Sequence, residues 1–334
     1  MVRGTGPMNK SWQDLRVLIA GCGSIGRRHA EVLHGLGVRD LLACDPAPEQ
    51  LAGLISGTPS VAACASFEEG LERRPDAVYI LSPTRLHIPM AKQAMQAGAH
   101  VFMEKPLSDT MEGVDEFERF ADEAGKAVMV GLCFRFHAGI VQAKKWVEQG
   151  RIGRVVSVRA MMGEHFPDIR PDYKSTYYAK YSGAFELMHD LDLAIWFAGQ
   201  SVKQVHAVYG SFSDIGIEAP DVAELLLAFE DRCTATVHLD FFQAPRRRQL
   251  EIIGTSGTII VQFGSWEHCI VSCGTRGSDS WEHVQLDTDR NDMFRDESRH
   301  FLQAIAGGSP VQCGISGARK SLEVIQEAYL TQKK

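Results

Sequence analysis

The chain begins with an apolar run followed directly by a glycine-rich turn, and this order constrains the fold more than any other feature. Residues 15–20 form a short apolar run, as expected for a buried parallel strand. Gly21, Gly23 and Gly26 follow, and a helical apolar pattern then continues to Gly37. The first glycine permits a tight turn, the second lets the backbone approach a pyrophosphate, and the third lets the helix pack on the strand. The segment therefore predicts a dinucleotide-binding unit.

An acidic residue stands at the end of the next predicted strand. Asp45 follows the apolar residues 41–44 and lies nineteen residues after Gly26. A carboxylate at this place accepts hydrogen bonds from a ribose 2′-hydroxyl. It would repel a 2′-phosphate, and the residues that follow it, 46–48, are Pro-Ala-Pro and include no arginine. We therefore expect NAD as the cofactor, with NADP the less favoured alternative.

Composition excludes several classes of function. A net charge of −7 argues against nucleic-acid binding, which requires a basic face. The eight cysteines are scattered. Cys269 and Cys273 are the only close pair, and no second pair stands at zinc-ligand spacing, so we expect neither a structural metal nor a disulfide framework. No apolar run approaches the length of a membrane helix, and no signal-like segment precedes the first strand. We expect a cytoplasmic protein that binds no membrane.

Two domains follow from the order of the predicted elements. Strand-like and helix-like segments alternate through residues 12–131, which predicts a doubly wound parallel α/β (Rossmann) sheet that binds NAD. Residues 132–334 contain several strand-like runs with tight connections, which predicts an α+β domain with a mainly antiparallel sheet. We expect this second domain to bind substrate and to form a homodimer or homotetramer through its sheet. The last two predicted helices are candidates for packing back on the first domain.

Glu104-Lys105-Pro106 ends the fifth predicted strand, at the edge of the sheet where ligands bind. A lysine there is able to hold a substrate hydroxyl and stabilise the alkoxide that develops on it. A solvated surface charge is the alternative interpretation.

A second polar cluster lies on a predicted helix near residues 187–197. Glu186, His189 and Asp192 are spaced by three residues, which places them along one helix face. A histidine between two carboxylates is oriented and made more basic, as a general base requires. A surface helix with one hydrogen-bonded histidine is the alternative.

Together these segments resemble the glucose–fructose oxidoreductase/inositol dehydrogenase/rhizopine catabolism (Gfo/Idh/MocA) family. The resemblance runs from about Leu15 to the final helix. It is carried by residues 21–29, the strand end at 82–87, the segment 98–106, residues 135–137 and the helix at 188–192.

The resemblance implies roles for individual residues. Lys105 and His189, with Glu186 as the nearby acid, would be the catalytic group. Many members place an aspartate four residues before the histidine, where this chain has Phe185, and the glycine run before the helix is reduced to Ser182-Gly183. The implied cofactor-binding residues are Gly21, Gly23, Ser24, Ile25, Gly26, Asp45, Ser82, Thr84, His87, Glu104 and Lys105, and the implied substrate residues are Arg135, His165, Lys174, Tyr177 and Asp192.

The function predicted from these observations is hydride transfer between a nicotinamide and a hydroxyl or keto carbon of a sugar, polyol or sugar derivative. Two alternatives on the same scaffold are an NAD-dependent glycosidase that oxidises its sugar transiently and a non-catalytic protein that senses dinucleotides.

Overall fold

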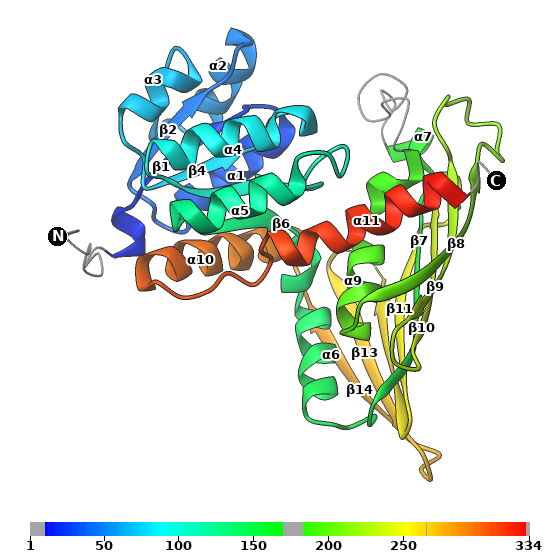
Figure 1. Cartoon of the computed structure of the whole chain (residues 1–334). Coiled ribbons are helices and arrows are strands. Elements are labelled where there is room, and N and C mark those ends of the chain that lie inside the picture. The colour runs from blue at the N-terminus through cyan, green and yellow to red at the C-terminus, as the bar shows by residue number, and fades with distance from the viewer. Residues whose placement is uncertain (1–10, 170–182, 265, 332–334) are drawn as a thin grey trace. The chain divides into compact units, whose positions relative to one another are not determined.

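In the computed structural model, residues 11–169, 183–264 and 266–331 are described (Figure 1). The chain divides into two compact units. The first contains the residues up to Cys133 together with Asn291–Leu322, and the second contains Phe134–Arg290 together with the residues from Glu323 onward. Among the described residues, no helix is both long enough and apolar enough to cross a membrane.

The first unit is built on a six-stranded parallel sheet with the order β3-β2-β1-β4-β5-β6, so the predicted Rossmann topology is confirmed. The sheet interior is apolar because its central strands are buried on both faces, whereas Ala62 and Ala63 of the edge strand β3 are exposed. The strands are β1 (Arg16–Ala20), β2 (Asp40–Cys44), β3 (Val61–Ala63), β4 (Ala77–Ile80), β5 (His100–Glu104) and β6 (Val128–Gly131).

Helices connect and cover these strands. Helix α1 packs against α2 and α10, and α4 packs against α5. Helix α3 is capped at its first turn, where the Ser66 side chain accepts a hydrogen bond from the Glu69 N–H. The segments are η1 (Trp12–Asp14), α1 (Ser24–Gly35), α2 (Pro48–Gly57), α3 (Phe67–Glu72), η2 (Thr84–Leu86), α4 (His87–Gln96), α5 (Val114–Ala124) and α10 (Asp292–Gly307).

The second unit is built on an eight-stranded sheet with the order β14-β13-β12-β11-β7-β10-β9-β8. Every neighbouring pair is antiparallel except β7 and β10, so the expected mainly antiparallel sheet is confirmed. The strands are β7 (Val155–Gly163), β8 (Val202–Gly210), β9 (Val222–Phe229), β10 (Thr234–Asp240), β11 (Arg247–Gly254), β12 (Gly257–Phe263), β13 (His268–Thr275) and β14 (Trp281–Asp287).

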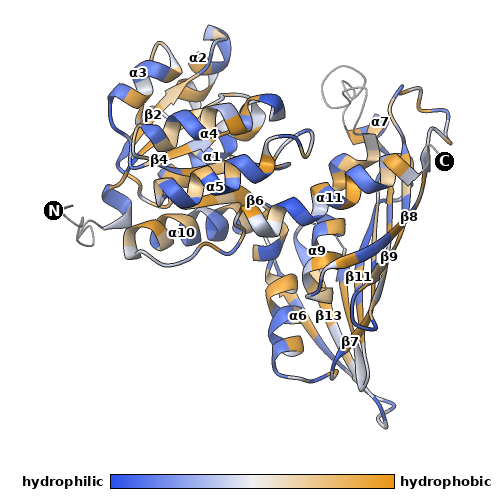
Figure 2. Ribbon diagram, viewed as in Figure 1, coloured by the Kyte–Doolittle hydropathy of each residue, from blue (hydrophilic) through white to orange (hydrophobic). Residues whose placement is uncertain are grey.

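One face of this sheet carries helices. Helix α9 packs against β7, β10 and β11, and α6 packs against β12 and β13. Along β10 the side chains alternate between buried and exposed, and Figure 2 shows hydrophobic and hydrophilic residues mixed along these strands. The remaining segments are η3 (Cys133–Phe136), α6 (Ala138–Glu148), α7 (Phe166–Ile169), η4 (Gly183–Leu187), α9 (His189–Ala198) and α11 (Ile315–Thr331).

Some elements differ from their sequence predictions. Helix α2 and strands β13 and β14 were not predicted. In β14 every residue is at least partly exposed, because it is an edge strand with no further strand beside it, and so its sequence lacks the strong apolar alternation of a central strand. The helix predicted near residues 187–197 begins at His189, and Glu186 lies on the preceding 3-10 turn η4.

Candidate functional site

The glycine-rich turn of the first unit has the geometry that a dinucleotide requires. Gly21 has φ +107°, and a Cβ there would lie 2.6 Å from the Leu81 carbonyl oxygen. A Cβ on Gly26 would lie 2.1 Å from the Gly21 oxygen, so helix and turn are in close contact. A Cβ on Gly23 would meet no atom within 4 Å. The turn is thus open at the one glycine that must face a pyrophosphate, and α1 begins at Ser24 with its first N–H groups available for it.

The carboxylate of Asp45 is held beside this turn. One oxygen accepts the N–H of Cys22 at 2.7 Å, and the other accepts the N–H of Ala47 at 2.8 Å. An ionised carboxylate has about four acceptor sites, so two such bonds orient it and leave acceptor capacity for ribose hydroxyls. The residues of this edge therefore fit an adenosine ribose and pyrophosphate.

An arginine that the sequence did not single out contacts the same residue of the turn, Cys22, as Asp45 does. The Arg27 guanidinium, from α1, donates to the Gln50 side chain at 3.0 Å and to the Cys22 carbonyl at 3.4 Å. An arginine in this region is the group that accommodates a 2′-phosphate in NADP enzymes. A carboxylate and a guanidinium therefore both hydrogen-bond the backbone of Cys22 in the glycine-rich turn.

His87 connects two loops at the carboxyl ends of the strands. Its Nδ1 lies 2.8 Å from the Pro106 carbonyl oxygen, and its Nε2 lies 3.0 Å from the Ser82 carbonyl oxygen. Burial lowers the pKa of His87, although both carbonyl contacts oppose that shift. Its ring nitrogens are engaged with the protein backbone, so His87 holds the loop that follows Lys105 against the loop that contains Ser82 and Thr84.

Glu104 anchors Lys105 from behind. One carboxylate oxygen lies 3.2 Å from His29 Nε2, and the other accepts the Lys105 N–H at 3.1 Å. On the neighbouring strand a Cβ at Gly131 would lie 3.3 Å from the Glu104 oxygen, so glycine leaves room for this carboxylate. Burial alone would raise the pKa of Glu104, but the His29 hydrogen bond and the charges of His29 and Lys105 hold it below its usual range. The ionised, largely buried Glu104 carboxylate therefore holds the backbone from which the Lys105 side chain extends.

In the second unit, His189 is the first residue of α9 and is partly exposed. Its ring lies 5.0 Å from that of Phe134, centroid to centroid, at an interplanar angle of 45°. Glu186 is also partly exposed and lies one turn earlier on η4. An imidazole and a carboxylate are the side chains that general acid–base catalysis most often uses.

Two buried ion pairs hold α9 in place. Asp190 accepts two hydrogen bonds from Arg248 of β11, at 2.9 and 2.6 Å. Asp192 accepts two from Arg135, at 2.8 and 2.6 Å. The Arg248 guanidinium also stacks on Phe134, 3.4 Å from the ring centroid. The sequence analysis did not identify Asp190 and Arg248 as site residues. Arg135 and Asp192 were both predicted to contact substrate, and in the structure they form an ion pair with each other.

The remaining predicted substrate residues lie in two places. His165 follows β7, and its Nδ1 lies 2.7 Å from Asp168. Lys174 and Tyr177 lie outside the described residues.

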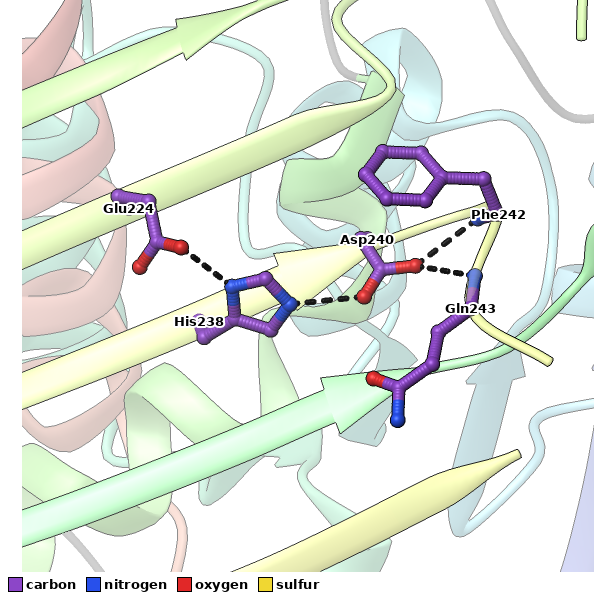
Figure 3. A network of polar contacts seen from close by, with 5 residues as sticks. All are labelled: Glu224, His238, Asp240, Phe242 and Gln243. Carbon is purple, nitrogen blue, oxygen red and sulfur yellow. Dashed lines mark hydrogen bonds and ion pairs between the residues drawn. The ribbon is translucent and has the colours of Figure 1, made fainter. Parts of the chain in front are cut away.

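A polar network fixes the sheet end from which His165 extends (Figure 3). His238 Nδ1 lies 2.5 Å from Glu224, and its Nε2 lies 2.7 Å from Asp240. The other Asp240 oxygen accepts the N–H groups of Phe242 and Gln243. The hydrogen bond with Asp240, partly opposed by burial and reinforced by Glu224, raises the pKa of His238 to about 9.

The sheet order, the glycine turn and the anchored lysine define the class: an NAD(P)-dependent oxidoreductase with a Rossmann domain. The chain belongs to the Gfo/Idh/MocA family. Residues 15–132 match its model described as "Oxidoreductase family, NAD-binding Rossmann fold", and residues 140–260 match the "GFO/IDH/MocA C-terminal domain".

Characterised relatives are similar at low identity. The chain is 28% identical over 227 residues to myo-inositol dehydrogenase Hyg17 of Streptomyces leeuwenhoekii, covering 68% of this chain and 66% of that enzyme. It is 26% identical over 339 residues to UDP-N-acetylglucosamine 3-dehydrogenase of Acidithiobacillus ferrooxidans, covering 95% and 98%. A structure of levoglucosan dehydrogenase with NADH and levoglucosan matches with a TM-score of 0.83 at 20% identity, covering 96% and 98%, which shows a shared fold.

The Arg135–Asp192 pair leads to a prediction about stability. Arg135→Met leaves the buried Asp192 carboxylate without its main partner, so the free energy of unfolding should fall by about 3–5 kcal/mol. The double variant Arg135→Met/Asp192→Leu removes both charges and should recover most of that loss. Urea unfolding measures both. A loss below about 1 kcal/mol in the single variant would contradict the structural role of the pair.

His238 predicts a stability that depends on pH. Its folded pKa of about 9 exceeds the ordinary value of 6.5, so its stabilisation is fully present below pH 6.5 and lost as pH rises through 9. The advantage of wild type over His238→Asn should therefore shrink over this range, by at most about 1.4 kcal/mol per pH unit. His206→Asn, at an exposed histidine of β8, is the control and should show no such trend. A constant difference across the range would refute the assignment.

Proposed function

We propose that this protein is an NAD-dependent dehydrogenase or reductase that acts on a CH–OH group of a sugar, polyol or sugar derivative. The observation that carries the proposal is the anchoring of Lys105 by Glu104 at the carboxyl end of β5, in the unit whose glycine turn fits a dinucleotide. The printed names of the relatives, which include inositol and sugar-nucleotide dehydrogenases, support the substrate class.

Each residue has a proposed role. A bound nicotinamide dinucleotide supplies the acceptor for the hydride. His189 accepts the hydroxyl proton, Lys105 stabilises the alkoxide oxygen with its positive charge, and Glu186 orients His189 or relays its proton. Glu104 and His29 keep the lysine in position.

The second unit has two further proposed roles. We propose that residues 132–334 bind the substrate, with His165, Lys174 and Tyr177 contributing to specificity and the Arg135–Asp192 pair shaping the region around His189. We also propose that the sheet face opposite α9 joins copies of the chain into a homodimer or homotetramer. Exposed apolar residues on that face include Val208, which lies opposite Glu224, and Leu226, which lies opposite His206; they are 58% and 48% exposed.

A screen with both cofactors tests this function. The purified protein should reduce NAD to NADH in the presence of at least one member of a panel of sugars, polyols, inositols and nucleotide sugars. Lys105→Met is the control, and its turnover should fall by roughly 10²-fold or more with the dissociation constant for NADH unchanged. Release of an aglycone without net NADH would indicate the glycosidase alternative, and dinucleotide binding without turnover on any substrate would indicate a sensor.

Asp45 predicts the cofactor preference. The kcat/KM should favour NAD over NADP, because the fixed carboxylate repels a 2′-phosphate at hydrogen-bonding distance. Asp45→Ala should weaken that preference, and Arg27→Met in the wild-type background should strengthen it by removing the nearby positive charge. A wild type that prefers NADP, or an Asp45→Ala variant with unchanged preference, would contradict the assignment.

His189 predicts a pH profile for oxidation. Wild-type kcat should rise with pH and level off near a histidine-like pKa, because a neutral imidazole must accept the proton. His189→Asn should lose about 10²–10⁴-fold in kcat, and its residual rate should keep rising at alkaline pH as the hydroxyl ionises unaided. If the variant kept the wild-type rate and profile, the proton acceptor would be another group.

A further inference from the structure

One end of the sheet in the second unit carries an ion pair that no role has yet absorbed. Gly163 ends β7 and is the cross-strand partner of Arg247, which begins β11. The next residues beyond these two are Glu164 and Arg246, and the Arg246 Nε lies 3.1 Å from a Glu164 carboxylate oxygen. The side chains of Arg246 and Glu164 are only 19% and 14% exposed. The strand register therefore brings a largely buried arginine to this edge of the sheet.

The contact with Glu164 leaves most of the Arg246 guanidinium without a partner. Its Nε is buried and makes no well-directed hydrogen bond with any described residue. Glu164 is also the only carboxylate within ion-pair distance of it in the described part of the chain. A guanidinium has five N–H donors in a planar fork that binds a carboxylate or a phosphate through two parallel hydrogen bonds. The terminal nitrogens of Arg246 are therefore available to a ligand.

The surroundings of Arg246 make its positive charge costly. Burial, and then the positive charge of Arg248, lowers the pKa of the Arg246 guanidinium, whereas the charges of Glu164 and Asp190 oppose that shift. An arginine stays charged in proteins, so the folded state bears this cost. A bound anion would reduce it, because a nearby opposite charge favours the charged form.

A tryptophan brings a second arginine to the same place. Trp266 lies in the turn between β12 and β13, and Arg290 follows β14. The guanidinium carbons of Arg246 and Arg290 lie 5.0 and 4.7 Å from the Trp266 ring centroid, within the range of a cation–π contact. Arg290 is exposed. Two guanidiniums at one ring concentrate hydrogen-bond donors and positive charge at this edge.

The tryptophan also connects the two arginines to the proposed base. Its ring lies 6.3 Å from that of Phe134, centroid to centroid, and the Phe134 ring lies 5.0 Å from that of His189. His165, a predicted substrate residue, directly follows Glu164. All of these residues belong to the second unit. One aromatic ring therefore stands between His189 and the tryptophan at which the arginines gather.

We infer that Arg246 and Arg290, held at Trp266, form an anion subsite beside His189, and that the substrate is an acidic sugar with a carboxylate or a phosphate group. The arginines bind the anionic group through charge-assisted hydrogen bonds while the hydroxyl to be oxidised lies at His189. The assignment of a substrate rests on the proposed function, whereas anion binding requires no turnover.

Matched sugars test the substrate class. Glucose, glucuronate and glucose 6-phosphate share a ring and differ in the group at C6, and the galactose series provides a second set. With NAD, kcat/KM for an acidic member should exceed that for its neutral partner by roughly 10- to 100-fold. The uronate and phosphate arms distinguish the two anionic groups. A neutral sugar that is oxidised as well as its acidic partners would overturn the proposal.

Substitution of Arg246 tests the subsite. Arg246→Gln should raise KM for the acidic sugar by roughly 10- to 100-fold and leave kcat nearly unchanged, because the contact is equally strong in the ground and transition states. The kcat/KM for the neutral partner should not change. Arg247→Gln makes the same charge change at the adjacent, exposed residue and is the control, which should behave as wild type.

Two results with the variants would contradict the subsite. They are an unchanged KM for the acidic sugar in Arg246→Gln and an equal loss with acidic and neutral sugars, which would indicate a structural role. If Arg246→Gln does not fold, Arg290→Gln, at an exposed residue, takes its place with a KM effect in the same direction.

Calorimetry separates the subsite from the reaction. Protein loaded with NADH should bind glucuronate or glucose 6-phosphate more tightly than glucose, and Arg246→Gln should abolish the difference. This binding pattern without oxidation of any sugar would uphold the subsite and count against the proposed function. Oxidation of sugars without a preference for the acidic members would uphold the function and overturn the subsite. If no acidic sugar binds or reacts, the subsite is also overturned.

Discussion

The Glu104 carboxylate is the interaction on which the candidate site depends. It is placed at the end of β5, accepts the N–H of the lysine that follows it, and contacts a histidine one turn into the helix that begins at the glycine-rich turn. A carboxylate in an apolar interior is stable only when donors surround it. The requirement to satisfy this one group therefore ties together the dinucleotide turn, the strand end and Lys105.

The requirement that donors surround a buried carboxylate also applies in the second unit. Asp190 and Asp192 enter the interior from the first turn of α9, and each is met by an arginine from a distant part of the chain. Neutralised in this way, the two acids fix the beginning of α9, which is where His189 lies. These pairs add little to the free energy of unfolding compared with apolar residues in their place, because replacing a buried ion pair by apolar residues is often neutral. What the pairs supply is a defined helix start.

Local patterns in the sequence were sufficient to predict much of this. Gly21, Gly23, Gly26 and Asp45 follow a spacing whose chemistry is short-range, and the alternating apolar runs predicted the parallel sheet. The partners Arg248 of Asp190 and Arg135 of Asp192 lie 58 and 57 residues away, and no local pattern links them. The buried acid Glu297 of α10 does have a sequence signal, because it occupies a core-facing position between Phe294 and Phe301, where an apolar residue is expected. Strand β14 was not predicted because its exposed sequence has little apolar periodicity.

The most direct test of the account is to follow the hydrogen on the oxidised carbon. A substrate found in the screen, deuterated at that carbon, should transfer its deuterium to the nicotinamide, and the label should appear in the reduced dinucleotide by mass spectrometry in an amount equal to the keto product formed. That result would establish net hydride transfer by this protein. Deuterium that is returned to the sugar product or lost to water, without labelled reduced dinucleotide accumulating, would contradict the account.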